Sequence, residues 1–339
     1  MKSFVKQFPP AMLSLVAAFL SGACSSTEVI DGPSLSEPKG KTITLTVSSP
    51  GVAGTRGIHD SHKLRYVAKL VEGDMKDTRN VLERKEALVS DGDATITFSV
   101  EEGSYTIVLF ADYIKSEEKD ASGFYQDCYY DTNDATYPEI VKVKNFEINN
   151  DNLDFFANVV RVEKGAEEVK KDITLSRMVS KIRFVSTTTL DDSREVTGIS
   201  FTKIPYYSKM NIDAKEVGIE DPATHSSGTA GSPVNLSPEG DEMPELFYFY
   251  TLANKSGDLT KLGETNFSVA FKDGETKIIS IPMGTISSVR NSQTIVQGAF
   301  LSAEPKQLGD IILNLSVPGG TSSSDGWDTG TSSDIEVEW

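Results

Sequence analysis

A single cysteine near the N-terminus has the neighbours that covalent lipid attachment requires. Residues 20–24 (LSGAC) place small residues directly before Cys24, and they end an apolar run, residues 11–20, that follows Lys2 and Lys6. A positive start, an apolar core and small residues before a cleavage site are the parts of a secretory signal. Small residues directly before a cysteine are typical of a bacterial lipobox. The pattern therefore predicts a signal peptide cleaved before Cys24 and acylation of this cysteine, for example with palmitate.

Two other interpretations of this N-terminus are an ordinary signal peptide with a chance cysteine and a short anchor helix. The apolar run is about half of the roughly 20 residues that span a bilayer as a helix. Chance explains little of the small residues before the cysteine, so we favour lipidation. Each buried CH2 of an acyl chain contributes about 0.8 kcal/mol. Lipid on Cys24 would then hold the mature chain at a membrane.

The other residues that could do chemistry predict no active site. His59 and His62 are at most half of a metal site, no cysteine or further histidine lies near them, and His225 is far along the chain. We interpret them as loop residues. No phosphate-binding loop, dinucleotide-binding glycine motif or serine nucleophile motif occurs. Acidic runs at residues 131–134 and 149–152 lack the alternating ligands of a calcium loop. We therefore expect no enzyme activity, no cofactor and no metal.

The second cysteine and a group of tyrosines have two interpretations each. Cys128 has no partner if Cys24 carries lipid, so it is an inert thiol or a nucleophile, and we favour the first. The fold then depends on its core and not on a disulfide. Tyrosines at residues 125–137 either stack on sugars or pack a loop onto a sheet. The second role is more common for tyrosine.

The charge balance excludes a large class of partners. The 339 residues include 50 acidic and 33 basic side chains, for a net charge of −17. Removing residues 1–23 takes away two lysines and no acid, so the mature chain is more negative still. A chain this acidic repels phosphate backbones and anionic membrane surfaces. We expect no nucleic-acid partner.

The element nearest the mature N-terminus is a half-buried strand. Residues 42–47 alternate, with Ile43, Leu45 and Val47 on one face and threonines on the other. Residues 49–51 (SPG) are typical of a turn and end the strand. The alternation predicts that one face of this strand lies against a core.

Short apolar or alternating segments recur along the chain, and long helical patterns are missing. Residues 94–100 and 104–113 flank a turn and predict a hairpin. Many short strands separated by turn residues pack as β-sandwiches, so the fold class predicted is all-β. The other predicted strands are 64–71, 80–89, 140–148, 153–162, 173–175, 179–185, 199–204, 246–252, 267–271, 277–281 and 311–317.

Length and composition favour two domains. We predict a signal peptide at 1–23, a lipidated flexible tether at 24–41, β-sandwich domains at 42–171 and 172–317, and a flexible tail with a terminal strand at 318–339. A charged link at residues 164–171 places the domain boundary near Asp172, and residues 222–242 form a Ser/Gly/Pro-rich insertion that we expect to be mobile.

The chain ends on a second alternating segment. In residues 334–339 (DIEVEW), Ile335, Val337 and Trp339 share one face and acidic residues occupy the other. The tail before it has almost no apolar content and can hardly fold by itself. Two interpretations stay open: an edge strand that pairs within its own domain, or a donor strand on a flexible arm that pairs with a neighbouring subunit.

Several segments, taken in order, resemble fimbrillin-like lipoproteins of Bacteroidales. Residues 103–113 (GSYTIVLFADY), followed by 129–132 (YYDT), resemble the first domain of that family, and residues 153–157 (LDFFA) resemble its next strand. Residues 175–182 (LSRMVSKI) resemble the start of the second domain. The late strand pair of that domain has its counterpart here in Arg290, Asn291, Thr294, Gly298 and Leu301. With the lipobox, the resemblance spans nearly the whole mature chain.

The resemblance implies two tandem transthyretin-like Greek-key β-sandwiches in an outer membrane lipoprotein that builds cell-surface fimbriae and supports adhesion. In polymerising members, a trypsin-like protease cuts after an arginine and frees an N-terminal strand, and the C-terminal strand of the next subunit fills the groove. Other members are tips or membrane anchors. The implied partners are other fimbrial subunits, by strand exchange, and a host or bacterial surface ligand. The Gly/Ser tail and the insertion depart from the family pattern, so the subunit role stays open.

Arg56 fits such a maturation site. It lies in residues 51–57, a small-residue loop after the strand at 42–47, and proteases need an extended segment of this kind. Cutting there would release the strand and leave an apolar groove. The alternative is an exposed arginine that is never cut, as a membrane anchor subunit would require.

A different class of function stays open beside the fimbrial one. A lipid-anchored β-sandwich can also be a surface protein that binds glycans and does not polymerise. Sugar platforms usually present aromatic rings on loops, but Trp327 and Trp339 both lie in the terminal tail. This placement favours the fimbrial subunit.

Overall fold

The computed structural model of the 339-residue chain describes fifteen segments. These are residues 28–31, 42–50, 62–74, 81–89, 92–115, 117–133, 138–189, 194–213, 218–225, 228–231, 235–236, 243–254, 260–302, 312–316 and 332–335. Within them the regular structure is strand, apart from one 3-10 turn, η1 (Asp151–Leu153). The all-β prediction is confirmed.

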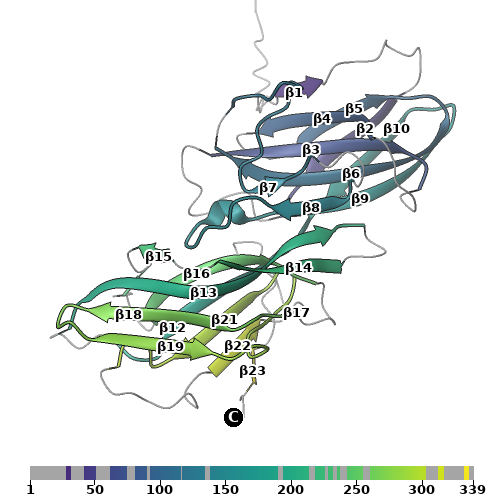
Figure 1. The fold of residues 1–339 in the computed structure, drawn as a ribbon. Helices are drawn as coiled ribbons and strands as arrows, with labels where there is room; N and C mark the ends of the chain where they lie inside the picture. The colour runs from purple at the N-terminus through teal and green to yellow at the C-terminus, as the bar shows by residue number, and fades with distance from the viewer. Residues whose placement is uncertain are drawn as a thin grey trace, which may run out of the picture.

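The first sandwich pairs a six-stranded sheet with a three-stranded sheet (Figure 1). The six-stranded sheet has the order β1 (Glu28–Asp31), β4 (Val81–Val89), β3 (Lys63–Glu72), β6 (Gly103–Ile114), β9 (Phe156–Lys164), β11 (Ser176–Arg177). The three-stranded sheet has the order β10 (Val169–Thr174), β2 (Thr42–Ser48), β5 (Ala94–Ser99). Apolar side chains from both sheets form the core between them.

The second sandwich has a five-stranded and a larger sheet. The first has the order β16 (Glu245–Leu252), β12 (Val179–Ser186), β21 (Gln293–Gly298), β22 (Ile312–Ser316), β23 (Ser332–Ile335). The second has the order β19 (Thr276–Ile281), β18 (Thr265–Phe271), β13 (Val196–Asn211), β8 (Ile140–Val143), β7 (Tyr130–Asp131), and β14 (Gly218–His225) and β15 (Gly228–Gly231) also pair with β13. A short pair, β17 (Thr260–Lys261) with β20 (Ser287–Ser288), completes it. Its core is aromatic, with Phe184 stacked on Phe247 at 4.4 Å between ring centroids.

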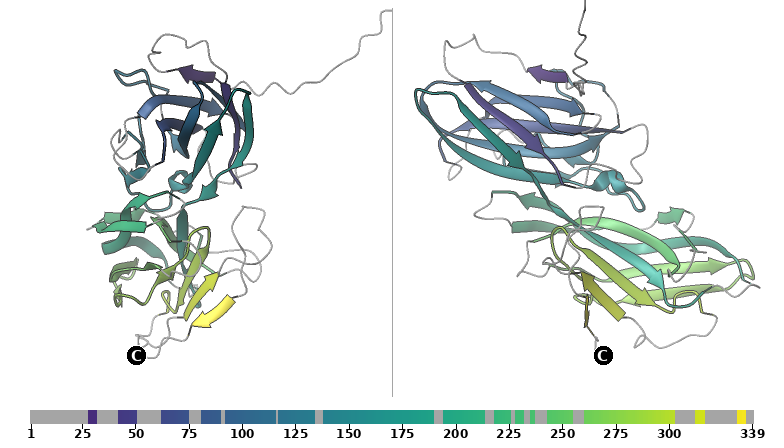
Figure 2. Two further views of the ribbon diagram at one scale, coloured as in Figure 1. Left: turned by 90° about the vertical axis from the view of Figure 1, so that its right-hand side faces the viewer. Right: turned by 180° about the vertical axis from the view of Figure 1, so that it is seen from behind.

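Strands β3 and β6 are buried along most of their length because both faces of the six-stranded sheet are covered. One face packs on the three-stranded sheet. The other contributes Val67, Val108 and Phe110 to an apolar cluster that the second sandwich completes with Met210 and Tyr250. Strand β13 extends across this junction and pairs with β8, so the two sandwiches share both an apolar cluster and a sheet (Figures 1 and 2).

Polar contacts surround this shared cluster. The Met178 N–H donates to the Phe155 carbonyl at 2.8 Å, and the Tyr250 hydroxyl donates to Asp151 Oδ1 at 2.7 Å. Arg161 of β9 forks onto both Oδ atoms of Asp213, at 3.0 and 2.9 Å. These bonds join residues in or next to elements of the first sandwich to residues in or next to strands of the second, so the junction combines burial with hydrogen-bonded polar groups.

Three details differ from the sequence-based expectations. The predicted boundary at Asp172 falls inside β10, and β11 still pairs with β9 of the first sandwich. Strand β8 belongs to residues 130–143 of the chain but pairs with β13 of the second sandwich, and β7 adds to the same sheet by pairing with β8. Strand β10 begins within the charged residues 164–171, which are interpreted from the sequence as a link between domains. A half-exposed strand such as β10 needs apolar residues on one face only, so charged residues on the other face are compatible with it.

The predicted tether and the predicted hairpin also differ. Residues 28–31 form β1, which pairs with β4, and are thus not part of the flexible tether that the sequence predicts for residues 24–41. Backbone pairing at an edge needs no apolar pattern, so composition did not reveal it. Strands β5 and β6 do not pair with each other: they lie in different sheets, and Ile96 and Ile107 meet in the same core. The turn between them is a corner from one sheet to the other.

Candidate functional site around strand β2

Strand β2 lies in the middle of the three-stranded sheet, between strands from distant parts of the chain. It pairs antiparallel with β5, where Leu45 faces Ile96. It pairs parallel with β10, where Ile43 faces Val169 and Val47 faces Ile173. Both edges of the strand therefore bond to backbone neighbours.

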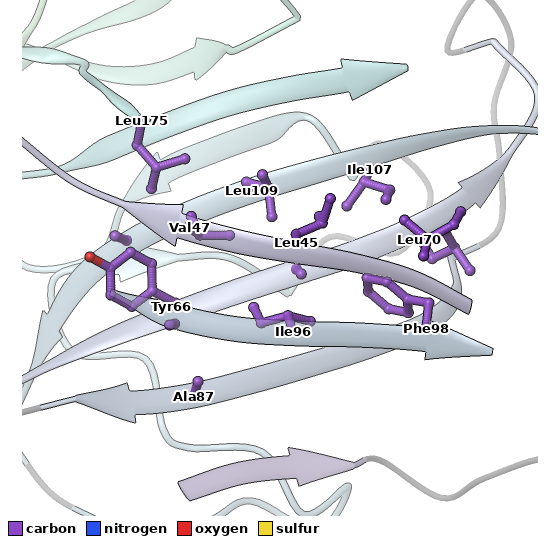
Figure 3. Packing of buried hydrophobic residues seen from close by; sticks show 14 of the residues in the cluster. Leu45, Val47, Tyr66, Leu70, Ala87, Ile96, Phe98, Ile107, Leu109 and Leu175 are labelled. Carbon is purple, nitrogen blue, oxygen red and sulfur yellow. The ribbon is translucent and has the colours of Figure 1, made fainter. Parts of the chain in front are cut away.

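The inward face of β2 carries three apolar side chains. Ile43, Leu45 and Val47 are each 0% exposed. Figure 3 shows Leu45 and Val47 among side chains of β3, β5 and β6, and the buried cluster that they join includes Phe98 and Leu109. Full burial of an aliphatic side chain contributes about 1.5–3 kcal/mol. The alternation seen in the sequence is thus the division between core and surface.

The outward face of β2 is polar and makes hydrogen bonds across both pairings. The Thr42 hydroxyl donates to Glu168 Oε1 at 3.3 Å, the Thr44 and Thr97 hydroxyls lie 3.2 Å apart, and the Ser48 hydroxyl donates to Thr174 at 3.3 Å. These contacts are partly or fully exposed, so they fix register more than they stabilise the fold.

Removing β2 would leave two kinds of unsatisfied surface. The facing edges of β5 and β10 would present unpaired backbone N–H and C=O groups. The positions of Ile43, Leu45 and Val47 would become an apolar groove over the core. An extended segment that alternates apolar and polar residues satisfies both needs, because backbone bonds provide affinity and the alternate side chains set register.

Several of the predicted site residues lie outside the described part of the chain. They are Cys24, Arg56, Val337 and Trp339, together with the signal peptide. The described residues after β2 stop at Pro50, six positions before Arg56. Ile335 is the last residue of β23, which pairs antiparallel with β22, Ile335 facing Leu313. In this structure the start of the terminal alternation thus pairs within its own chain.

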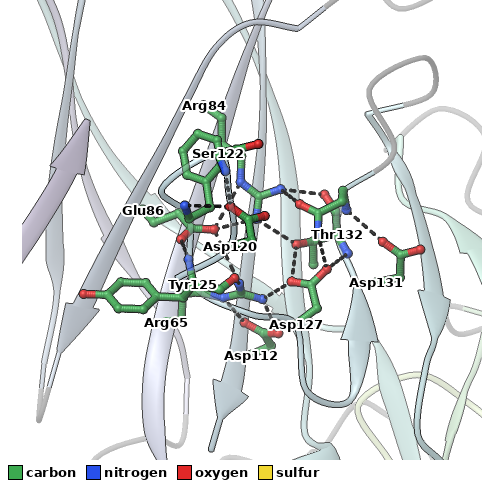
Figure 4. Close-up of polar contacts among 12 residues, drawn as sticks. Arg65, Arg84, Glu86, Asp112, Asp120, Ser122, Tyr125, Asp127, Asp131 and Thr132 are labelled. Carbon is green, nitrogen blue, oxygen red and sulfur yellow. Dashed lines mark hydrogen bonds and ion pairs between the residues drawn. The ribbon is translucent and has the colours of Figure 1, made fainter. Parts of the chain in front are cut away.

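A buried ionic network is the main polar feature that the sequence analysis missed (Figure 4). Arg65 of β3 is 0% exposed and forks onto Asp112 of β6, with Nε to Oδ1 at 3.0 Å and Nη2 to Oδ2 at 2.8 Å. Its Nη2 also donates to Asp127 at 2.7 Å, and its Nη1 donates to Glu86 of β4 at 3.4 Å. The sequence signal for the network is slight: Asp112 lies inside an otherwise uncharged strand, but β3 and β4 each carry several charged residues.

The network attaches residues 117–133 to the face of the six-stranded sheet that points away from the three-stranded sheet. The Tyr125 N–H donates to Glu86 at 2.8 Å, and the Thr132 N–H donates to Asp127 at 2.8 Å. Burial raises the pKa of Asp127, but Arg65 and the Thr132 N–H more than offset it and hold that pKa below the ordinary value. Burial raises the pKa of Asp112, against the opposing effect of Arg65.

The tyrosines and histidines have structural surroundings. Tyr125, Tyr129 and Tyr130 are almost fully buried, so the interpretation that they pack a loop onto the sheet is confirmed for these three. His62 Nε2 lies 3.0 Å from the Tyr129 hydroxyl, and His225 ends β14 beside Phe146, within the predicted insertion. Among the described residues no group of three or more His, Cys, Asp or Glu side chains is placed to hold a metal ion.

A family model matches most of the chain. Residues 36–314 match the family described as "Family of unknown function (DUF6562)". The chain belongs to this family. The match includes β2 and reaches into β22, so both sandwiches are part of what the family shares. A comparison with curated proteins gave no match.

Solved structures with a similar fold come from species of Bacteroides and Porphyromonas. A candidate polysaccharide-binding protein from Bacteroides thetaiotaomicron has 11% identity and a TM-score of 0.45, with 88% of this chain and 98% of that chain covered. A candidate cell adhesion protein from Bacteroides eggerthii has 14% identity and a TM-score of 0.43, with 82% and 96% covered. The fimbrial anchor protein Mfa2 from Porphyromonas gingivalis has 14% identity and a TM-score of 0.38, with 86% and 99% covered. Among the described residues, no helix has both the length and the apolar character to cross a membrane.

Proposed function

We propose that this protein is a structural subunit of a bacterial surface fimbria, exported as an outer membrane lipoprotein and assembled by strand exchange. The observation that carries the proposal is the position of β2. It is the second described strand of the chain, its three inward side chains are fully buried, and it lies between two strands that remain if it leaves. The stretch of sequence that follows it contains Arg56, the proposed cleavage site.

The terminal segment has the spacing that the vacated groove would need. Ile43, Leu45 and Val47 occupy every second position of β2, and Ile335, Val337 and Trp339 repeat this spacing at the C-terminus. As donor, the terminal strand would leave β22, its one sheet neighbour among the described strands, and gain partners on both edges. Each subunit would give a strand to a different neighbour, so the contact is head-to-tail and generates a filament.

Lipid on Cys24 would hold the subunit at the outer membrane before cleavage after Arg56. The partners in this proposal are other fimbrial subunits, and the assembled filament would carry adhesion to a host or bacterial surface. A subunit that is never cut would remain a membrane anchor instead. This choice between stalk and anchor depends on processing, not on the fold.

Strand donation is tested with one substitution on each face of the terminal strand. Val337→Asp should abolish filament formation, because an ionised carboxylate would have to enter the apolar groove. Glu338→Gln, on the opposite face, should assemble like the unchanged chain. Filaments are counted by electron microscopy, and monomer melting temperature is measured in parallel. Normal filaments from Val337→Asp would exclude donation, and a lowered melting temperature without loss of filaments would show a strand used only within its own domain.

The N-terminus of the surface protein tests processing. Mass spectrometry of assembled material should find a chain that starts at Gly57, whereas Arg56→Ala should leave acylated Cys24 as the N-terminus and keep the protein in the membrane fraction. Finding only acylated Cys24 in filaments of the unchanged chain would favour the anchor role. Loss of membrane attachment in Cys24→Ala checks the lipid site.

A further inference from the structure

The segment before residue 51 is attached to the first sandwich at two separate places. Strand β2 lies inside the three-stranded sheet, and β1 lies on the edge of the six-stranded sheet, next to β4 (Figure 2). The backbone of Glu28–Asp31 pairs antiparallel with β4 over four residue pairs, from Glu28 facing Leu88 to Asp31 facing Lys85. One continuous stretch of chain therefore contacts both sheets.

The β4 edge is a site for an extended backbone. An edge strand presents a row of N–H and C=O groups, and an added strand satisfies them. Two of the β4 residues that pair with β1 are themselves held in place. Ala87 is buried in the core of the first sandwich, and Glu86 accepts the hydrogen bonds from Tyr125 and Arg65 described above. The backbone edge of β4 is therefore held rigidly by the packing of Ala87 and the hydrogen bonds of Glu86.

We propose that the β4 edge is a binding site for the chain's own residues 28–31, and that it retains the N-terminal segment on the subunit after the chain is cut in residues 51–61. The proposal rests on the proposed function, because it concerns the same cleavage and the same groove. Cleavage then does not open the groove. The groove opens when an incoming strand displaces β2, and β1 must be released as well.

Two attachment points on one segment strengthen each other. Ten residues, 32–41, separate β1 from β2. If β2 frays while β1 stays bound, β2 remains at an effective concentration of about millimolar and rebinds, and such linkage raises overall affinity by roughly 10²–10⁴. The cut subunit thus keeps its apolar groove covered, which limits aggregation through exposed strand edges.

Retention also determines when the subunit leaves the membrane. Cys24 lies four residues before Glu28, and an extended chain spans about 3.3–3.6 Å per residue, so a lipid on Cys24 stays within roughly 14 Å of β1. A cut subunit that still holds its N-terminal segment keeps this lipid without a covalent link. Release from the membrane then follows strand exchange and not cleavage.

The test weakens β1 and leaves β2 unchanged. In the mature chain with Cys24→Ala, residues 52–57 are replaced by the recognition sequence of a specific protease, so the cut does not depend on Arg56. The double variant Val29→Pro/Ile30→Pro removes two backbone donors of β1. Ser36→Pro, between β1 and β2, is the matched control. After complete cutting, size-exclusion chromatography measures how much N-terminal segment stays with the body at increasing urea, and hydrogen exchange is measured at residues 85–88.

We expect the cut chain and the Ser36→Pro control to retain the segment in buffer and to protect residues 85–88. The double proline variant should release it at lower urea, dissociate at least about tenfold faster and lose protection at residues 85–88. Equal release and equal protection in all three proteins would overturn the proposal. Release is measured without any donor strand, so this outcome is separate from failure of the groove to accept residues 332–339 as a peptide, which would count against strand exchange itself.

Discussion

Arg65 shows how a fully buried charged residue of a strand is accommodated. Its guanidinium is surrounded by Asp112, Asp127 and Glu86, and it also donates to the Tyr125 carbonyl at 2.9 Å. Burying a charge is costly unless it is paired and hydrogen-bonded, and here it is both. What the network provides is attachment: it fixes residues 117–133, which carry three buried tyrosines, onto the sheet that faces the second sandwich.

Replacing Arg65 should therefore be strongly destabilising. Arg65→Ala leaves the buried Asp112 and Asp127 without the guanidinium that pairs with them, whereas Glu86 keeps Arg84 as a partner. Breaking a buried pair in this way costs about 3–5 kcal/mol. The free energy of unfolding from urea titration measures the loss. Lys170→Ala is the comparison, because Lys170 pairs with Glu168 at an exposed site and such pairs contribute about 0–1 kcal/mol. Similar small losses in both variants would show that the network does not stabilise the fold.

At the scale of elements, β2 combines a simple local pattern with an unusual position. Its alternation makes one face apolar, but it is held between β5 and β10, whose residues lie far away in the chain. Strand β10 begins at Val169, and its Ile173 and Val169 pack against the core that β2 completes. Because no short turn connects β2 to β5 or to β10, another strand can replace β2 while β5 and β10 keep their own connections along the chain.

The core contribution of β2 can be measured at its central residue. Leu45→Ala should lower the free energy of unfolding by about 2–5 kcal/mol, because it removes buried methyl groups and leaves a cavity. Thr46→Val, on the outward face, retains the β-branched shape and should change stability by about 0.5 kcal/mol or less. Both variants are compared by urea titration. A tolerated Leu45→Ala would mean that the groove holds β2 by its backbone alone.

At the scale of the whole molecule, buried tyrosines gather where the two sandwiches meet. Tyr129, Tyr130 and Tyr250 belong to the shared apolar cluster. The Tyr130 hydroxyl donates to the Leu153 carbonyl at 2.6 Å. Burial raises the pKa of Tyr129 to about 12 and raises the pKa values of Tyr130 and Tyr250 well above the ordinary value of 10.0. The neutral phenols are thus part of what joins the two sandwiches.

These raised pKa values predict the response to alkali. In the unfolded chain tyrosine ionises near pH 10, but in the folded protein Tyr129 keeps its proton up to about pH 12. The stabilisation is complete below pH 10 and is lost as the pH rises from 10 through 12. We expect the melting temperature to fall steeply over this interval, together with a late rise of phenolate absorbance. Tyr130→Phe should flatten the fall, and an unchanged slope in that variant would contradict the explanation.

The all-β class and the inward face of β2 could be predicted from the sequence, because alternation with period two is a local property of the chain. The two-sandwich organisation followed from chain length and from the family resemblance. Tertiary structure alone decided that β10 is the parallel partner of β2, that β8 joins β13, and that residues 28–31 pair with β4. It also decided that Arg65, Glu86, Asp112 and Asp127 meet. Partner choice depends on which backbone edges and charges are brought together across long stretches of chain, and nothing in the spacing of neighbouring residues records that.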